Sequence, residues 1–165
     1  MARRIAVLAA FCFWMGGFVF YAGVVVPIAR RTLNPPTQQA FITNQVSVVI
    51  HLAGSLALVL MFADSQTACD PHPRRVRWRR GLCLLLAAAH GLLVWTHWQI
   101  SGQLDAGTGS IGPAENWYPF HRVYLLTATV QVFAASAWII LTLFAWRRED
   151  RSSSGDPGVS ATGGL

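Results

Sequence analysis

The sequence predicts an all-α integral membrane protein, a four-helix bundle whose two termini both lie in the cytoplasm. Three observations lead to this fold class. Charged residues make up only 12% of the chain, whereas they make up about 25% of an ordinary soluble domain. Four apolar runs are each long enough to cross the roughly 30 Å of a bilayer's hydrocarbon core. Arginines gather in short clusters at the ends of these runs, as basic residues do in membrane proteins.

The first expected helix covers about residues 5–28 and contains no charged residue. Its apolar stretch is longer than the ~7–15 apolar residues of a secretory signal peptide. The sequence also offers no clear cleavage site of small residues before further apolar residues follow. We therefore expect this segment to be retained as a membrane-spanning helix.

The other three expected helices cover about residues 41–63, 81–100 and 118–146. The segment NPPTQQ (34–39) is predicted to be a turn, because proline disfavours helix in the residue before it. Residues 101–117 are rich in glycine and serine and are predicted to form an outer loop. Residues 1–148 thus form one transmembrane domain, and the composition of residues 149–165 predicts a disordered cytoplasmic tail.

The orientation follows from the arginines, because basic residues concentrate on the cytoplasmic side of a membrane protein. With four spans, one side holds Arg30, Arg31 and Arg122, and the adjacent Arg30 and Arg31 are the exception to the rule. We therefore expect a multi-pass protein of the bacterial cytoplasmic (inner) membrane, surrounded by the lipid bilayer. The side that holds both termini carries Arg3, Arg4, Arg74, Arg75, Arg77, Arg79, Arg80, Arg147, Arg148 and Arg151.

Each expected helix carries one stripe of small or polar residues, which predicts the face that points into the bundle. In lipid, helices associate through close packing of small residues and through polar contacts. The stripes are, in chain order, Ala9, Cys12, Gly16 and Gly23; Asn44, Ser47, His51, Gly54 and Ser55; Cys83, Ala87, His90, Val94 and His97; and His121, Ala128, Val132, Ala135 and Ser136, with Gln131 beside them.

Two histidines, His51 and His90, are expected at the same depth on facing helices, roughly 15 Å into the membrane at about 1.5 Å per residue. Such a pair can supply both axial ligands of a b-type haem, so a haem-binding redox protein is one hypothesis. The alternative is that neutral histidines hydrogen-bond with neighbours such as Asn44, Ser47 or Gln131 and hold the bundle together.

A second pair, His97 and His121, is expected near the outer rim, close to Glu115 in the loop between their helices. Imidazole and carboxylate ligands together suit zinc, and imidazole also suits copper. These three residues are therefore candidate ligands for Zn or Cu handled at the outer face. A structural role for the two histidines remains the alternative.

Other function classes find less support in the sequence. The arginines lie at the ends of the apolar runs and not along one face, so nucleic acid is not an expected partner. The three cysteines include no CxxC pair, so thiol exchange is not expected. All seven acidic residues fall outside the expected spans, which disfavours a proton-coupled exporter. We expect a non-enzymatic structural or partner-binding subunit that associates with itself or with another membrane protein.

Three stretches carry a resemblance: WMGGFVFYAGVVVPIARRTL (14–33), FITNQVSVVIHLAGSLAL (41–58) and FHRVYLLTATVQ (120–131). They resemble small bacterial four-helix membrane proteins of unknown function and, distantly, the membrane domain of copper-resistance D proteins. The resemblance covers about residues 5–148. It implies a multi-pass inner-membrane protein, and it supplies no catalytic residue.

Overall fold

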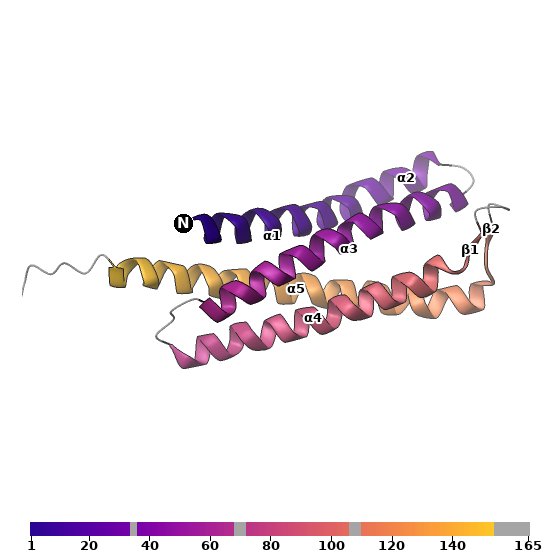
Figure 1. The fold of residues 1–165 in the computed structure, drawn as a ribbon. Coiled ribbons are helices and arrows are strands. Elements are labelled where there is room, and N and C mark those ends of the chain that lie inside the picture. Colours follow the sequence, from indigo (N-terminus) through magenta and orange to yellow (C-terminus); the bar gives the residue numbers. More distant parts are fainter. Residues whose placement is uncertain (34–35, 68–71, 106–109, 154–165) are drawn as a thin grey trace, which may run out of the picture.

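The computed structural model describes residues 1–33, 36–67, 72–105 and 110–153, without the side chains of residues 36, 114–116 and 152–153. Four helical segments lie side by side (Figure 1). They are α1 (Ala2–Phe20), which continues through the π-helical turn η1 (Tyr21–Val25) into α2 (Val26–Thr32); α3 (Pro36–Thr67); α4 (Pro73–Ser101); and α5 (Ala114–Ser153). Each segment is long and apolar enough to cross a membrane. The predicted all-α fold of four helices is confirmed.

The helices extend beyond the spans expected from hydropathy. α3 begins at Pro36, inside the segment 34–39 predicted as a turn, and residues 34–35 lie outside the described part. α4 begins at Pro73, whereas the sequence predicted that this helix starts near residue 81. Proline is well tolerated in the first turn of a helix, because its missing N–H would have no partner there. α5 runs to Ser153, so the start of the predicted tail is helical, and residues 154–165 lie outside the described part.

A short antiparallel hairpin lies within the predicted outer loop. It consists of β1 (Leu104–Asp105) and β2 (Ser110–Ile111), with Leu104 opposite Ile111. The Gly112 N–H donates to the Gln103 carbonyl at 2.8 Å next to this pairing. Composition alone predicted a loop here, because strands of two residues are too short to show a hydrophobic period.

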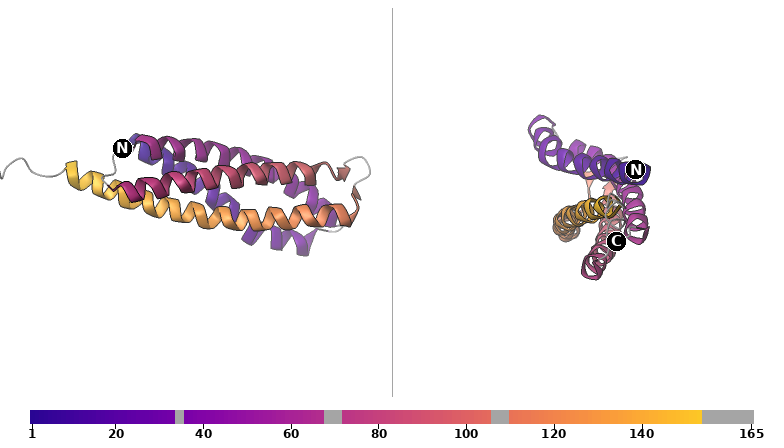
Figure 2. Two further views of the ribbon diagram at one scale, coloured as in Figure 1. Left: turned by 90° about the horizontal axis from the view of Figure 1, so that it is seen from below. Right: turned by 90° about the vertical axis from the view of Figure 1, so that its left-hand side faces the viewer.

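The two ends of the bundle differ. The N-terminus, the end of α3, the start of α4 and the last turns of α5 lie at one end, here named the termini end. The strands β1 and β2 lie at the other, the hairpin end (Figure 1). α4 and α5 pack against each other along most of their length, and α3 packs against both α1 and α4. Figure 2 shows that α2 swings away from α4 and α5 toward the hairpin end.

The first helical segment contains a π-helical turn where α1 passes into α2. Pro27 has no N–H to donate to the carbonyl four residues earlier, and its ring crowds that carbonyl. The wider π turn at Tyr21–Val25, directly before Pro27, accommodates this mismatch. A helix kink at such a turn is expected from the sequence chemistry. The first helical segment packs against α3 mainly through α1, and α2 lies away from α5 (Figure 2).

The centre of the bundle is apolar and closely packed. Ala57, Met61, Leu86, Ala135 and Trp138 have essentially no exposed surface. The small side chains of the two alanines allow close packing between helices in the layer that contains the large indole of Trp138. Large apolar side chains cover the outer surface, as a lipid-facing bundle requires, with Phe13 71% and Phe133 72% exposed.

The predicted inner face of the first helix is wrong. Its stripe of small residues, Ala9, Cys12, Gly16 and Gly23, is exposed. Trp14 and its neighbours Val7 and Met15 are buried instead. The reason is that the small residue at this contact lies on α3, where Gly54 receives the Trp14 indole, so α1 supplies the large side chain.

The inner faces of the other helices are largely confirmed. Ser47, His51 and Gly54 of α3 are buried, as are Cys83 and His90 of α4 and Gln131, Ala128 and Ala135 of α5. Four residues of these predicted stripes, Ser55, Ala87, Val94 and Ser136, are exposed. The burial of Leu86 and Leu93 in α4 shows that large side chains fill the interior beside the small ones.

A buried ion pair joins α3 and α4 at the termini end. Arg79 Nη2 lies 2.6 Å from Asp64 Oδ2, and the two side chains are 1% and 0% exposed. Asp64 was expected just beyond the second span, and the structure places it within α3, where its side chain is buried. α3 continues past it to Thr67, so the carboxylate is enclosed by the bundle.

Each of the four helical segments contributes to this ion pair. Arg3 of α1 places Nε 3.1 Å from Asp64 Oδ1. From α5, Trp146 donates its indole N–H to the same oxygen at 3.3 Å, and Thr142 Oγ1 accepts from Arg79 Nε at 3.1 Å. These hydrogen bonds satisfy the buried charges, and this is what allows an ion pair to be buried without a large penalty.

Replacing Arg79 by glutamine should destabilise the protein by about 3–5 kcal/mol, because the buried Asp64 carboxylate loses its countercharge. The matched control is Arg80→Gln, since Arg80 is the next residue of α4 and is exposed. The free energy of unfolding in detergent, from titration with sodium dodecyl sulfate, measures both. The double variant Asp64→Asn/Arg79→Gln should lose less than the sum of its single changes. Equal stability of Arg79→Gln and Arg80→Gln would show that the pair does not hold the fold.

Candidate functional site

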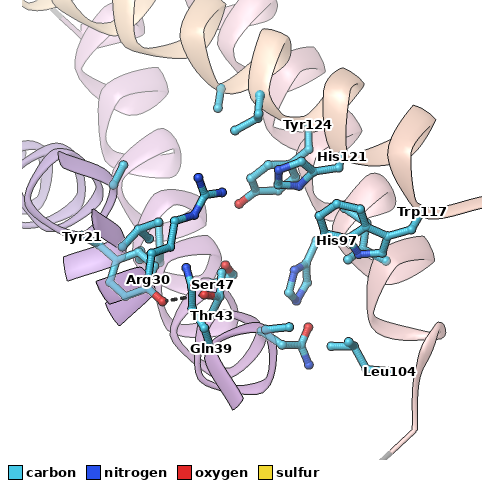
Figure 3. Close-up of a pocket in the computed structure, with 18 of the residues that line it drawn as sticks. Tyr21, Arg30, Gln39, Thr43, Ser47, His97, Leu104, Trp117, His121 and Tyr124 are labelled. Carbon is cyan, nitrogen blue, oxygen red and sulfur yellow. Dashed lines mark hydrogen bonds between the residues drawn. The ribbon is translucent and has the colours of Figure 1, made fainter. Parts of the chain in front are cut away.

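A cavity of about 620 Å³ lies at the hairpin end, where α2 diverges from α5. η1 and α2 form one wall, α5 forms the other, and α3 and α4 form the floor (Figure 3). Its volume falls within the roughly 300–1,000 Å³ of typical small-molecule sites. The lining residues are Phe18, Tyr21, Ala22, Val26, Arg30, Leu33, Gln39, Ala40, Thr43, Asn44, Ser47, Ile50, His97, Ile100, Leu104, Ile111, Trp117, His121, Tyr124, Leu125 and Ala128.

The wall formed by η1 and α2 carries one hydrogen bond and one cation. The Tyr21 hydroxyl, in the π turn, donates to Thr43 Oγ1 of α3 at 3.0 Å and so ties this wall to the floor. Arg30 extends from α2 toward the space between the helices (Figure 3). Within the described residues its guanidinium has no hydrogen bond and no ion pair. The cavity therefore has an available positive charge.

The wall formed by α5 is aromatic. The rings of Trp117 and His121 are stacked, with centroids 4.3 Å apart and planes at 17°. Trp117 Nε1 is buried and has no acceptor in the part of the chain that the structure describes. A buried N–H without an acceptor is unfavourable by about 1–3 kcal/mol, so an acceptor atom delivered to this wall would be stabilised.

The cavity floor ends on a cluster of three histidines, His51, His90 and His97. His97 lines the cavity, and its ring centroid lies 5.2 Å from that of His51. The His51 centroid lies 5.6 Å from that of His90, with the rings edge to face. Tyr124, which also lines the cavity, places its hydroxyl 3.5 Å from His51 Nε2. The histidine cluster therefore links the cavity to the interior of the bundle.

Hydrogen bonds assign the proton of His90. Gln131 donates its amide N–H to His90 Nδ1 at 3.2 Å, so Nδ1 is the unprotonated nitrogen. Nε2 lies 3.1 Å from the His51 carbonyl, which can only accept, so Nε2 carries the proton and donates to it. The Ser55 hydroxyl lies 3.1 Å from the same nitrogen. His90 is thus a neutral imidazole whose two nitrogens connect α3, α4 and α5.

Gly54 makes this arrangement possible. A Cβ at this position would lie 2.6 Å from His90 Cε1 and 2.6 Å from Trp14 Nε1. Both distances are shorter than carbon–carbon and carbon–nitrogen contacts permit. The absence of a side chain at Gly54 therefore lets α1 and α4 approach α3 at the level of the histidine cluster.

His51 and His90, expected at equal depth on facing helices, lie with their rings edge to face. His51 also contacts His97, which was expected at the outer rim, so the three rings form one continuous cluster. His121 does lie at the rim and lines the same cavity as His97. The side chain of Glu115, the third predicted metal ligand, lies outside the described residues.

The histidines bear on both cofactor hypotheses. To ligate a haem, His51 and His90 would each have to present a ring nitrogen to the iron, and His90 would have to release one of its hydrogen bonds. Among the residues that the structure describes, no group of three or more His, Cys, Asp or Glu side chains is arranged to hold a metal ion. Haem at His51 and His90 and metal at His97, His121 and Glu115 therefore stay predictions.

Sequence reasoning missed three residues of the cavity: Arg30, Trp117 and Tyr124. Arg30 had a detectable signal, because it belongs to the arginine pair that breaks the positive-inside rule. Tyr124 lies three residues after His121, on the same helix face, and this spacing also could have identified it. Trp117 was interpretable only as an interfacial aromatic residue, since its stacking on His121 depends on the helix starting at Ala114.

Comparison with known families, with curated proteins and with solved structures found no match. The distant similarity to the copper-resistance D domain therefore stays a prediction. The interpretation of the site rests on its geometry.

The variant Gly54→Ala should be less stable than the wild type by about 1–3 kcal/mol, the usual effect of overpacking a tight interior. Gly91→Ala is the control, because a Cβ at Gly91 meets nothing within 4 Å. Unfolding in detergent, followed by circular dichroism, measures the difference. A neutral Gly54→Ala substitution would mean that the three helices are not in close contact at this level.

Proposed function

We propose that this chain is a non-enzymatic, four-span protein of the bacterial cytoplasmic membrane that binds a small molecule in the cavity at its hairpin end. The cavity itself is the observation that carries the proposal. It combines mainly apolar and aromatic walls with a few polar groups, among them Arg30, Asn44, His97 and Tyr124. This composition is typical of sites that enclose a ligand and orient it through a few hydrogen bonds.

The apolar centre of the bundle favours binding over conduction. Below the histidine cluster, Ala57, Met61 and Leu86 are fully buried, and they occupy the axis between the cavity and the Asp64–Arg79 ion pair. A path for solutes would need polar groups or water at this level. A site open at one end and closed by packing at the other fits a protein that holds a ligand.

The lining favours binding over catalysis as well. Within the described lining there is neither a carboxylate nor a cysteine that would serve as a nucleophile. Both nitrogens of His90 are engaged by protein groups, which suits a structural role. The notion of a partner-binding subunit also stays a proposal, and the exposed apolar surface of the bundle is compatible with a second copy or another membrane protein.

We place both termini in the cytoplasm and the cavity in the outer half of the membrane. The clusters at residues 3–4, 74–80 and 147–151 all belong to the termini end, which supports this orientation under the positive-inside rule. The cavity would then receive its ligand from the outer side.

Cysteine labelling in cells tests the orientation with two matched variants of α3, in a background whose native cysteines are replaced by alanine. Gln38 and Gln66 are both exposed and lie near opposite ends of this helix. A membrane-impermeant maleimide should label Gln38→Cys in intact cells and Gln66→Cys only after lysis. The reverse pattern would invert the orientation.

Filling the cavity tests the binding function. Ala40→Trp introduces an indole into the lining, whereas Ala88→Trp, the control, places it on the exposed face of α4. Native mass spectrometry of protein gently extracted from membranes should detect a retained small molecule on the wild type and on Ala88→Trp, with at least tenfold lower occupancy on Ala40→Trp. Equal occupancy in all three proteins, including none, would contradict the proposal, and an unchanged unfolding midpoint shows that Ala40→Trp is folded.

A further inference from the structure

We infer that the ligand is an amphipathic anion drawn from the membrane, with a carboxylate or phosphate head bound at Arg30 and an apolar chain lying along the cavity. This inference rests on the proposed binding function and names its ligand class. The available charge of Arg30, the apolar walls and the position of the cavity each contribute to it.

Arg30 supplies the charge. A guanidinium stays protonated in proteins and offers five N–H donors in a planar fork that matches carboxylate and phosphate oxygens. Two arginines at the termini end, by contrast, are paired: Arg4 with Glu149 and Asp150 at 2.7 Å each, and Arg79 with Asp64 at 2.6 Å. Arg30 has no such partner among the described residues, and it is an exposed residue of the cavity lining, so its guanidinium is accessible to a ligand.

The remaining polar groups of the cavity also favour binding of a negatively charged ligand. Arg30 is the one formally charged side chain in the described lining, so no carboxylate there repels an anion. The buried Trp117 N–H, across the cavity on α5, lacks an acceptor in the described part of the chain. Oxygen atoms of an anionic head would satisfy donors of this kind.

The walls and the level of Arg30 select an amphipathic anion over a small soluble one. Phe18, Val26 and Leu125 offer an apolar surface that inorganic phosphate would leave unused. The cavity is lined by α2 and α5, and in the orientation proposed above it lies in the outer half of the membrane, where lipid chains are present. Arg30 is near the end of α2, at the level where lipid head groups meet a spanning helix.

Three probes of equal chain length test the inference on the full-length protein in a neutral detergent: palmitate, hexadecyl phosphate and hexadecanol. Titration followed by native mass spectrometry should show at least tenfold tighter binding of the two anions than of the alcohol. Arg30→Gln should weaken binding of both anions at least tenfold and leave hexadecanol unchanged. Arg31→Gln is the matched control, because Arg31 is the next residue, is exposed and does not line the cavity. Inorganic phosphate should not compete.

The outcomes separate this inference from the proposed function. Equal binding of all three probes, unaffected by Arg30→Gln but abolished by Ala40→Trp, would overturn the anion and leave the cavity as a binding site. If inorganic phosphate competed with an affinity equal to that of hexadecyl phosphate, the apolar chain would not contribute to binding, and this part of the inference would be overturned. Binding of no probe, or binding that Ala40→Trp does not change, would overturn both the ligand class and the proposed site.

Discussion

The Asp64 carboxylate is the point at which the helices are joined. It accepts from Arg79 of α4, Arg3 of α1 and Trp146 of α5, while belonging itself to α3. In lipid, apolar side chains give no preference for one neighbouring helix over another, so directional polar contacts decide which surfaces meet. The ion pair and its hydrogen bonds thus fix the order and the rotation of the helices at the termini end. The apolar layer around Trp138 then packs in the register that this junction imposes.

The cavity exists because the first helical segment contacts α3 closely at two levels but lies away from α5 at the hairpin end. Arg3 holds it at Asp64, and the Trp14 indole, seated over Gly54, holds it again at the level of the histidines. The π turn lies between these contacts and Pro27, and the Tyr21–Thr43 hydrogen bond joins this turn to α3. The space that remains between α2 and α5 is lined by residues of both. Its size therefore depends on the course of the backbone in one cavity wall as much as on the side chains of the lining.

Hydropathy and arginine placement were sufficient to predict four helices and the clustering of basic residues at one end, because both follow from composition along the chain. The meeting of His51 and His90 was also predictable, since equal depth on adjacent helices needs only the rise per residue. The inner face of the first helix was not predictable. The large side chain at its contact with α3 belongs to Trp14 of α1, and the small residue is Gly54 of α3, whereas the sequence suggested that α1 supplies the small residues. The burial of Asp64 and the site at Arg30 depend on how far helices continue past the apolar runs, and hydropathy alone does not determine this.

The short separation along the chain between Asp64 and Arg79 has a consequence for biosynthesis. The two residues are fifteen positions apart, on helices joined by one connection. An isolated arginine or aspartate entering a bilayer is unfavourable by about 2.5–3.5 kcal/mol. In the membrane placement proposed above, the opposite charges would arrive on two consecutive helices and would neutralise each other on insertion. The contacts of Arg4 with Glu149 and Asp150 span almost the whole chain and form only after α5 is made. Assembly would then begin with the pairing of α3 and α4 and end when the N-terminal part of α1 contacts the C-terminal part of α5.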